Sequence, residues 1–145
     1  MDGCAQQTQL SCGRGVGRLF GQIVQIGIRS FDKKCDFVIY MNWAPCGECA
    51  NRLIGVFDNC DEGTVLFTAL YTSWNQDVSY KNYKGWTKLK ETVTFGFMRR
   101  PDYRCLKIRP PFNVKGNNKR HSAYAVDKMP YLHRASVRSF CDTLV

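Results

Sequence analysis

The apolar residues of the chain fall into short β-rich runs that alternate with runs of helical spacing. Residues 36–43, which read Asp-Phe-Val-Ile-Tyr-Met-Asn-Trp, form a mostly apolar run bounded by turn-forming residues, and this pattern predicts a buried strand. Pro45 follows, and the apolar residues after it recur at i, i+3, i+4 and i+7: Ala50, Leu53, Ile54 and Phe57. We therefore predict a helix that packs on the strand.

The alternation continues toward the C-terminus. Residues 64–71 predict a second buried strand, residues 85–91 a short helix and residues 92–98 a third strand. Residues 131–144 place apolar side chains on one helical face and predict a final helix. Because strands that alternate with helices usually pair in parallel, the sequence predicts an α/β fold class, with a mostly parallel or mixed central sheet flanked by helices.

The pattern is weaker toward the N-terminus. Residues 18–30 carry apolar side chains near the helical period and predict a helix, although Gly21 and Gly27 leave a strand as the alternative. Residues 1–17 are glycine-rich near their end and predict a poorly ordered segment that precedes the fold.

Length and composition agree with a single globular domain over residues 1–145. The chain has 145 residues, of which 44% are hydrophobic, and no run approaches the roughly 18 apolar residues of a membrane span. We find no signal peptide, and eight cysteines in a chain of this kind favour thiols and a metal site over a disulfide scaffold. These features predict a soluble intracellular protein of the cytoplasm or nucleus, without a membrane partner.

The charge is concentrated in the C-terminal half. Residues 1–72 hold six basic and seven acidic side chains, whereas residues 73–145 hold fifteen and five, and the net charge of the chain is +9. We predict residues 99–121 as a basic loop region, with further short strands at 106–108 and 123–126. One-sided charge favours a polyanionic partner such as nucleic acid, with a solvated loop as the alternative. The basic side chains of this region are Arg99, Arg100, Arg104, Lys107, Arg109, Lys115, Lys119 and Arg120.

The most specific local pattern is Asn-Trp-Ala-Pro-Cys-Gly-Glu-Cys at residues 42–49. Cys46 and Cys49 stand at the predicted start of a helix, where unpaired N–H groups favour thiolate over thiol. Cysteines at this spacing bind one zinc ion in many proteins. We favour zinc ligands, and a redox dithiol or two buried cysteines without a chemical role are the alternatives.

This motif and the elements after it resemble the AID/APOBEC polynucleotide cytidine deaminases. Residues 37–57 are similar to the family's strand, zinc-binding loop and helix, whose pattern is Ser-Trp-Ser-Pro-Cys followed by a nearby Cys-Ala. Residues 65–71 are similar to its next strand with the ending Phe-Thr-Ala-Arg-x-Tyr, and residues 85–98 to the helix and strand that follow. The resemblance spans roughly residues 36 to 105 and implies a cytidine deaminase-like layered fold.

The resemblance also implies a His-x-Glu motif, which supplies a third zinc ligand and the group that moves protons. No glutamate stands two residues after a histidine, and the only histidines, His121 and His133, both follow the thiol pair. Phe-Gly-Gln at 20–22 and Cys-Gly-Arg at 12–14 stand where the motif is expected, and neither ends in a residue that shuttles a proton. The sequence therefore offers no catalytic residue.

A structural zinc site is still open to this chain. Cys12 is a candidate third ligand beside Cys46 and Cys49, on the basis of spacing alone, and a loop thiol is the alternative. Zinc in a structural role is thus the one cofactor that the sequence predicts.

The resemblance assigns three aromatic residues to nucleic-acid binding. It places Trp43 in a pocket wall, and Tyr71 and Trp74 in a loop that lines a single-stranded nucleic-acid channel. Aromatic rings next to cations suit strand binding, because bases stack while phosphates pair with the charges. Core packing is the alternative for Trp43 and Tyr71, whereas Trp74 and Tyr80 lie in a predicted polar loop and are better candidates.

The sequence therefore favours a catalytically inactive deaminase-like protein, a pseudoenzyme, that binds single-stranded DNA or RNA through its basic C-terminal half. Two alternatives remain open. One is an active zinc-dependent cytidine deaminase that acts on polynucleotides with an unconventional acid or base. The other is a viral or host-interaction accessory protein that uses the scaffold to contact a protein partner.

Overall fold

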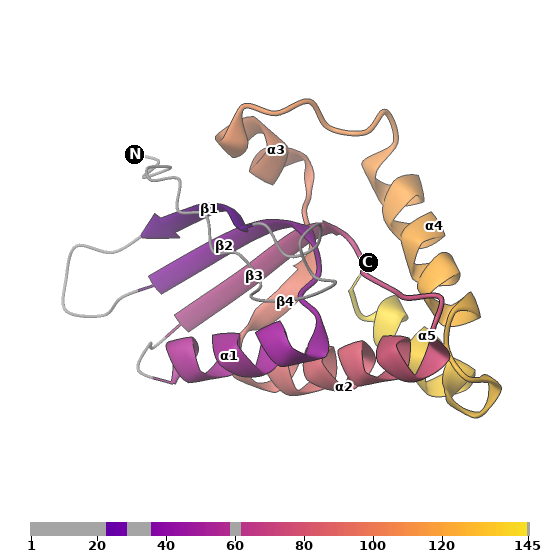
Figure 1. The fold of residues 1–145 in the computed structure, drawn as a ribbon. Helices are drawn as coiled ribbons and strands as arrows, with labels where there is room; N and C mark the ends of the chain where they lie inside the picture. Colours follow the sequence, from indigo (N-terminus) through magenta and orange to yellow (C-terminus); the bar gives the residue numbers. More distant parts are fainter. Residues whose placement is uncertain (1–22, 29–35, 59–61, 145) are drawn as a thin grey trace.

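A computed structural model of the chain describes residues 23–28, 36–58 and 62–144 (Figure 1). Within these ranges, four strands form one sheet in the order β1-β2-β3-β4. β1 pairs with β2 in antiparallel orientation, whereas β2 with β3 and β3 with β4 pair in parallel. The strands are β1 (Ile23–Ile28), β2 (Asp36–Trp43), β3 (Glu62–Ala69) and β4 (Thr94–Phe97). The predicted α/β class, with a mixed sheet flanked by helices, is confirmed.

The central strand β2 coincides with the predicted run 36–43. Val38 and Tyr40 belong to one buried apolar cluster, while Ile39 and Met41 belong to another. Successive side chains of a strand point to opposite faces, so apolar residues must follow one another where both faces are covered. This double burial is why the run reads as continuously apolar in the sequence.

The predicted helix over residues 18–30 is wrong where the structure describes it, because residues 23–28 form β1. β1 pairs with the outer edge of β2, with Ile26 opposite Ile39. This pairing satisfies backbone N–H and C=O groups of β2 that a helix would leave unpaired, and β-branched residues suit a strand. The rest of that prediction, and the predicted segment 1–17, lie outside the described residues.

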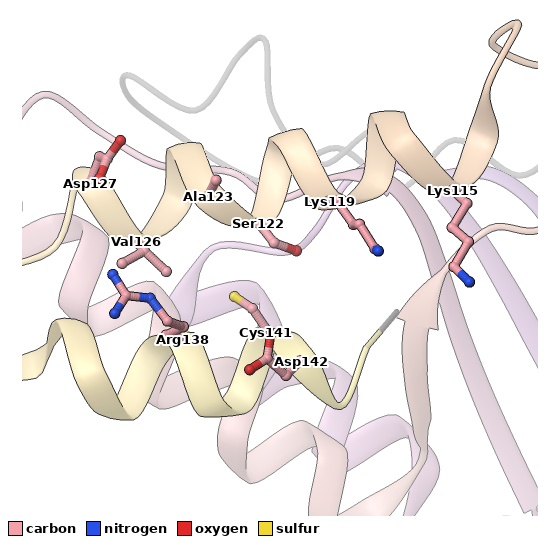
Figure 2. Close-up of a pocket in the computed structure, with 9 residues that line it drawn as sticks. All are labelled: Lys115, Lys119, Ser122, Ala123, Val126, Asp127, Arg138, Cys141 and Asp142. Carbon is pink, nitrogen blue, oxygen red and sulfur yellow. The ribbon is translucent and has the colours of Figure 1, made fainter.

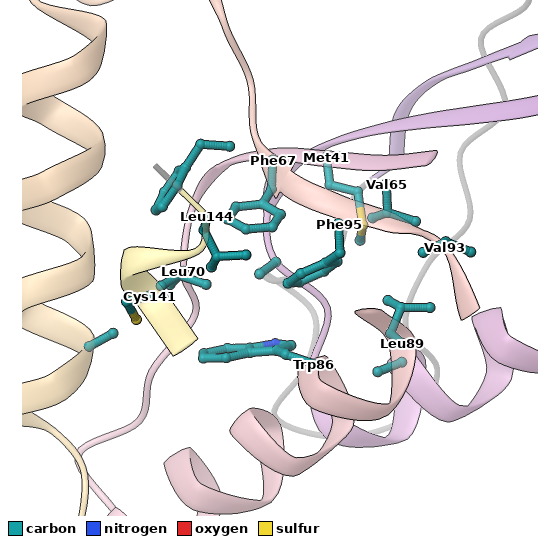
Figure 3. Close-up of a cluster of buried hydrophobic side chains, with 14 of the residues drawn as sticks. Met41, Val65, Phe67, Leu70, Trp86, Leu89, Val93, Phe95, Cys141 and Leu144 are labelled. Atoms are coloured by element: carbon teal, nitrogen blue, oxygen red, sulfur yellow. The ribbon is translucent and has the colours of Figure 1, made fainter. Parts of the chain in front are cut away.

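The helices flank the sheet (Figure 1). α1 (Gly47–Phe57), α2 (Gln76–Thr92) and α5 (Arg134–Asp142) contribute to the larger apolar core, part of which Figure 3 shows around Phe67, Trp86 and Phe95. α3 (Arg100–Leu106) packs on the opposite face through Tyr103, and α4 (Val114–Asp127) contributes to both clusters. None of the helices in the described ranges combines the length and apolar composition that a membrane crossing needs.

The helix predicted at residues 85–91 is longer in the structure, where α2 begins at Gln76. Its start is set by Asn75, whose side-chain oxygen accepts hydrogen bonds from the N–H groups of Asp77 at 2.9 Å and Val78 at 3.3 Å. Polar residues dominate the first turns, so the apolar period does not report them. Tyr80, predicted in a polar loop, lies in α2 instead, and its ring stacks on that of His133 at 3.8 Å.

The final helix predicted at residues 131–144 is confirmed in its main part. A 3-10 turn at Tyr131–His133 leads into α5, which buries Val137 and Cys141. Leu144, just beyond α5, is also buried.

Residues 99–121, predicted as a basic loop, are largely helical. The N–H of Arg99 donates to the Asp102 carboxylate at 2.7 Å where α3 begins, and Asn113 accepts from the N–H of Gly116 at 2.9 Å where α4 begins.

The strands predicted at residues 106–108 and 123–126 are wrong. The first segment contains the end of α3 and the turn after it, and the second lies inside α4. The buried face of α4 includes the polar residues Asn118 and Ser122 besides Val114, Ala125 and Val126. A helix that buries polar side chains shows a weak apolar period, which explains why the sequence pattern did not indicate it.

Candidate functional site

The loop that carries the cysteine motif lies at the carboxyl end of β2, and α2 holds it in place. The indole Nε1 of Trp86 donates to the carbonyl oxygen of Pro45 at 2.6 Å, and the Asn82 side-chain oxygen accepts from the N–H of Gly47 at 2.9 Å. Both contacts join residues far apart in the sequence. They fix the first turn of α1 and with it the position of Cys46.

Cys46 and Cys49 lie in different chemical states. Cys46 caps α1, and its half-buried thiol accepts a hydrogen bond from the N–H of Cys49 at 3.5 Å. Cys49 and Cys105 each take part in a disulfide, so the expectation of thiols in place of disulfides is wrong at these two positions. Residue spacing does not report which sulfurs a fold brings within bonding distance, and this is the reason for the error.

The disulfide bears on the predicted zinc site. A sulfur in a disulfide is not a thiolate ligand, so Cys49 as described does not fit zinc, and zinc binding stays a prediction for the reduced chain. Within the described ranges, no group of three or more His, Cys, Asp or Glu side chains is placed to hold a metal ion. Cys12, the predicted third ligand, lies outside these ranges.

Two glutamates follow a cysteine by two positions, in Cys46-Gly47-Glu48 and in Cys60-Asp61-Glu62. Glu62 begins β3, at the end of the strand away from the cysteine loop. The Glu48 side chain is exposed and accepts from the Arg52 guanidinium at 2.8 Å. Glu48 therefore lies at the surface of α1 and not in a water-excluded site.

Trp43 and Tyr71 meet at the carboxyl ends of β2 and β3. Their rings are 6.5 Å apart at 84°, an edge-to-face contact, and both side chains are half-buried. Burial raises the pKa of Tyr71, and the neighbouring Cys46 raises it further. Each aromatic ring therefore contributes partly to packing and partly to the surface.

A cleft of about 600 Å³ opens beside Trp43. Residues from the ends of β2 and β3, from α3 and the turn after it, and from α4 form its walls. The side chains that bring polar or aromatic chemistry to the cleft are Asn42, Trp43, Thr68, Tyr103, Arg109, Asn117 and His121. No carboxylate lines it among the described residues.

Two polar groups line this cleft, one on a buried side chain and one on a half-buried side chain. Tyr103 is only 2% exposed, and its hydroxyl has no hydrogen-bond partner within the described ranges. Burial raises the pKa of Tyr103, with a smaller contribution from Asp102, so the hydroxyl keeps its proton and stays a donor. Burial lowers the pKa of His121, and the nearby Arg120 lowers it further, so the imidazole is neutral at pH 7.

One face of α4 extends the cleft toward Trp74. Asn117, His121, Tyr124 and Lys128 follow one another at helical spacing, within an arc of roughly 60° and over about 16 Å of helix. The Lys128 ammonium lies 3.8 Å from the centre of the Trp74 ring and 5.1 Å from that of Tyr124. Trp74 is 87% exposed, as its predicted role in binding requires.

The structure distributes the predicted basic residues over separate surfaces. Arg109 lines the cleft, whereas Lys115 and Lys119 line a hollow between α4 and α5. Arg99 lines a groove along β4, and Arg120 donates to the side chain of Asn117 at 2.8 Å. The remaining three, all exposed, lie in α3 or at its C-terminal end: Arg100, Arg104 and Lys107.

Sequence reasoning missed Tyr103, Asn117, His121, Tyr124 and Lys128 as members of the site. The spacing of the last four indicates one helical face, but only once α4 is recognised as a helix. Comparison of the chain with models of protein families and with curated proteins finds no match to either. Function therefore has to be argued from the site.

Proposed function

We propose that this chain is a deaminase-like pseudoenzyme that binds single-stranded nucleic acid in the cleft at the ends of β2 and β3. One observation carries the proposal. Aromatic, cationic and hydrogen-bonding side chains line a path from Trp43 and Arg109 in the cleft, along α4, to Trp74. Ligands of open α/β sheets bind beyond the carboxyl ends of the parallel strands, which is where this path begins.

The side chains along the path match the parts of a nucleotide. Exposed rings such as Trp74 offer stacking surfaces for bases, and Arg109 offers a charge for a phosphate. The imidazole of His121 and the amide of Asn117 offer hydrogen bonds to the edge of a base or to a phosphate. The buried hydroxyl of Tyr103 adds a donor that has no protein partner in the described ranges.

The fold and the chemistry of the cleft support a deaminase-like origin without catalysis. The resemblance implies the order strand, cysteine loop, helix, strand, helix and strand. The chain has this order from β2 to β4, and these strands pair in parallel. The described walls of the cleft hold no carboxylate that could move a proton between water and an amine. We assign no reaction step to zinc, and its predicted structural role is tested by the zinc content of reduced wild-type protein and of Cys12→Ser.

The test is fluorescence anisotropy with single-stranded DNA and RNA oligonucleotides of about 15 nucleotides. We expect Trp74→Ala to weaken binding by about 1 to 3 kcal/mol without changing its salt dependence, because a stacked base is lost. Arg109→Ala should weaken binding and reduce the salt slope by about 0.7. Arg52→Ala is the matched control, because Arg52 lies on α1 and pairs with Glu48.

Equal effects of Arg109→Ala and Arg52→Ala would overturn the proposed path. Uracil formation from the cytosines of these oligonucleotides would instead establish an active deaminase. Recovery of a stable protein complex, together with no affinity for either oligonucleotide, would establish the accessory-protein alternative.

A further inference from the structure

A second hollow, of about 630 Å³, lies between α4 and α5 (Figure 2). Lys115, Lys119 and Ser122 line it from α4, at spacings of four and three residues. These positions are offset by two residues from Asn117, His121 and Tyr124, which is about 200° around a helix. The hollow is therefore on the opposite side of α4 from the proposed nucleic-acid path, and the two surfaces are separate.

The hollow has more basic than acidic side chains. Lys115 and Lys119 form no ion pair within the described part of the chain, and like charges four residues apart on a helix repel each other. From α5, Asp142 lies nearer to the lysine end than Arg138 does (Figure 2). Together with Asp127, the three basic and two acidic side chains leave an excess of one positive charge.

A buried hydroxyl faces the same hollow. Ser122 is only 8% exposed, and its oxygen has no nitrogen or oxygen partner within the described ranges. Its side chain points from α4 toward α5, on the side where the Lys119 ammonium also lies (Figure 2). Burial raises the pKa of the neighbouring Cys141 to about 11, against a hydrogen bond from the Ser122 side chain that lowers it. The thiol therefore adds no negative charge, and it is only a weak partner for the hydroxyl.

We infer that this hollow is a phosphate-binding site, in which Lys115 and Lys119 pair with the charge of a phosphate group and the Ser122 hydroxyl donates a hydrogen bond to one of its oxygens. The excess of basic over acidic side chains around the hollow favours an anion such as phosphate. Inorganic phosphate and the terminal phosphate of an oligonucleotide have this chemistry in common. The inference does not depend on nucleic-acid binding by the cleft.

The test is calorimetric titration with inorganic phosphate at constant ionic strength, with the binding position read from backbone amide shifts in NMR spectra. We expect saturable binding, with shifts centred on residues 115–142. Ser122→Ala should weaken it about tenfold without changing the net charge, and Lys119→Gln by at least as much. Lys88→Gln, which removes an exposed lysine of α2, is the matched control and should bind phosphate as the wild type does. Alanine is a strong helix former, so Ser122→Ala should retain α4, and urea unfolding checks this.

Two results would overturn the site: wild-type binding that does not saturate, or affinity that is the same in Ser122→Ala and wild type. A second titration compares one oligonucleotide with and without a 5′-phosphate. A preference for the phosphorylated strand that Ser122→Ala abolishes identifies the strand terminus as the source, and no preference leaves inorganic phosphate. Loss of oligonucleotide binding altogether, with phosphate binding intact, would refute the proposed function and not this site.

Discussion

Gly85 offers a direct test of the helix contact that holds the cysteine loop. A Cβ atom at this position would lie 2.8 Å from the Cα of Gly47 and 3.0 Å from the Cβ of Ala50. Both atoms belong to α1, and the nearer one is backbone, so neither moves aside without shifting the helix. We therefore predict that Gly85→Ala destabilises the fold, although the same change inside a helix usually stabilises it.

The magnitude follows from two opposing terms. Replacing glycine by alanine within a helix contributes about 1 kcal/mol of stability, whereas overpacking a close contact costs about 1 to 3 kcal/mol. Gly55, in α1, supplies the control, because a Cβ atom there would meet nothing within 4 Å. The helix-propensity term is common to both variants. The free energy of unfolding should therefore be about 1 to 3 kcal/mol lower for Gly85→Ala than for Gly55→Ala.

The assay is urea unfolding of both variants and the wild type, followed by circular dichroism. Gly55→Ala should be about 1 kcal/mol more stable than the wild type. If Gly85→Ala were stabilised by the same amount, the close approach of α1 and α2 would be refuted. The placement of Cys46 by Trp86 and Asn82, which depends on that approach, would then also be in question.

Two further predictions concern the cap of α2 and the cleft. Asn75→Ala should lower the free energy of unfolding by about 1 kcal/mol in the same urea assay, because the N–H groups of Asp77 and Val78 lose their acceptor. An unchanged free energy of unfolding would contradict the role of Asn75 as the N-cap of α2. Oligonucleotide affinity should rise as the pH falls from 7.5 to 5.5, because bound phosphate favours protonation of His121, whose lowered pKa keeps it neutral in the unliganded protein. Because the pKa of His121 is lowered in the folded chain, the unfolded chain binds more protons than the folded chain below about pH 6.5, and the free energy of unfolding falls as the pH is lowered there. His121→Gln should weaken the pH dependence of both affinity and stability. An unaltered pH profile of affinity would remove His121 from the path.

The sequence predicted the strands and helices whose apolar pattern directly reflects the faces that they bury in the fold. Residues 36–43 are apolar because β2 is covered on both faces, and the spacing of Ala50, Leu53 and Phe57 is the buried face of α1. β1 was predicted as part of a helix, because its strand conformation depends on pairing with β2 and the glycines of residues 18–30 did not decide between helix and strand. α4 was missed because Asn118 and Ser122 occupy its buried face.

The candidate site was predicted in part for the same reason. The resemblance assigned Trp43, Tyr71 and Trp74 to the site; Trp43 ends β2, and the other two follow β3, which are strands that the pattern located. Tyr103 comes from α3 and His121 from α4, and only the three-dimensional arrangement brings them to the ends of β2 and β3. The state of Cys49 was equally beyond the sequence, because a disulfide depends on the distance between sulfurs and not on their spacing along the chain.

The distribution of basic side chains decides how salt-sensitive nucleic-acid binding should be. If all eight cations between Arg99 and Arg120 contacted one strand, the slope of log affinity against log salt would be about −5 to −6, since each phosphate contact contributes about −0.7. In the structure Arg109 and Lys128 are the basic side chains placed along the described path, and they predict a slope of about −1.5. Anisotropy titrations between about 50 and 200 mM salt distinguish these values. A slope near −5 would mean that the strand crosses the surfaces of α3 and α4 together, and the path through the cleft would have to be abandoned.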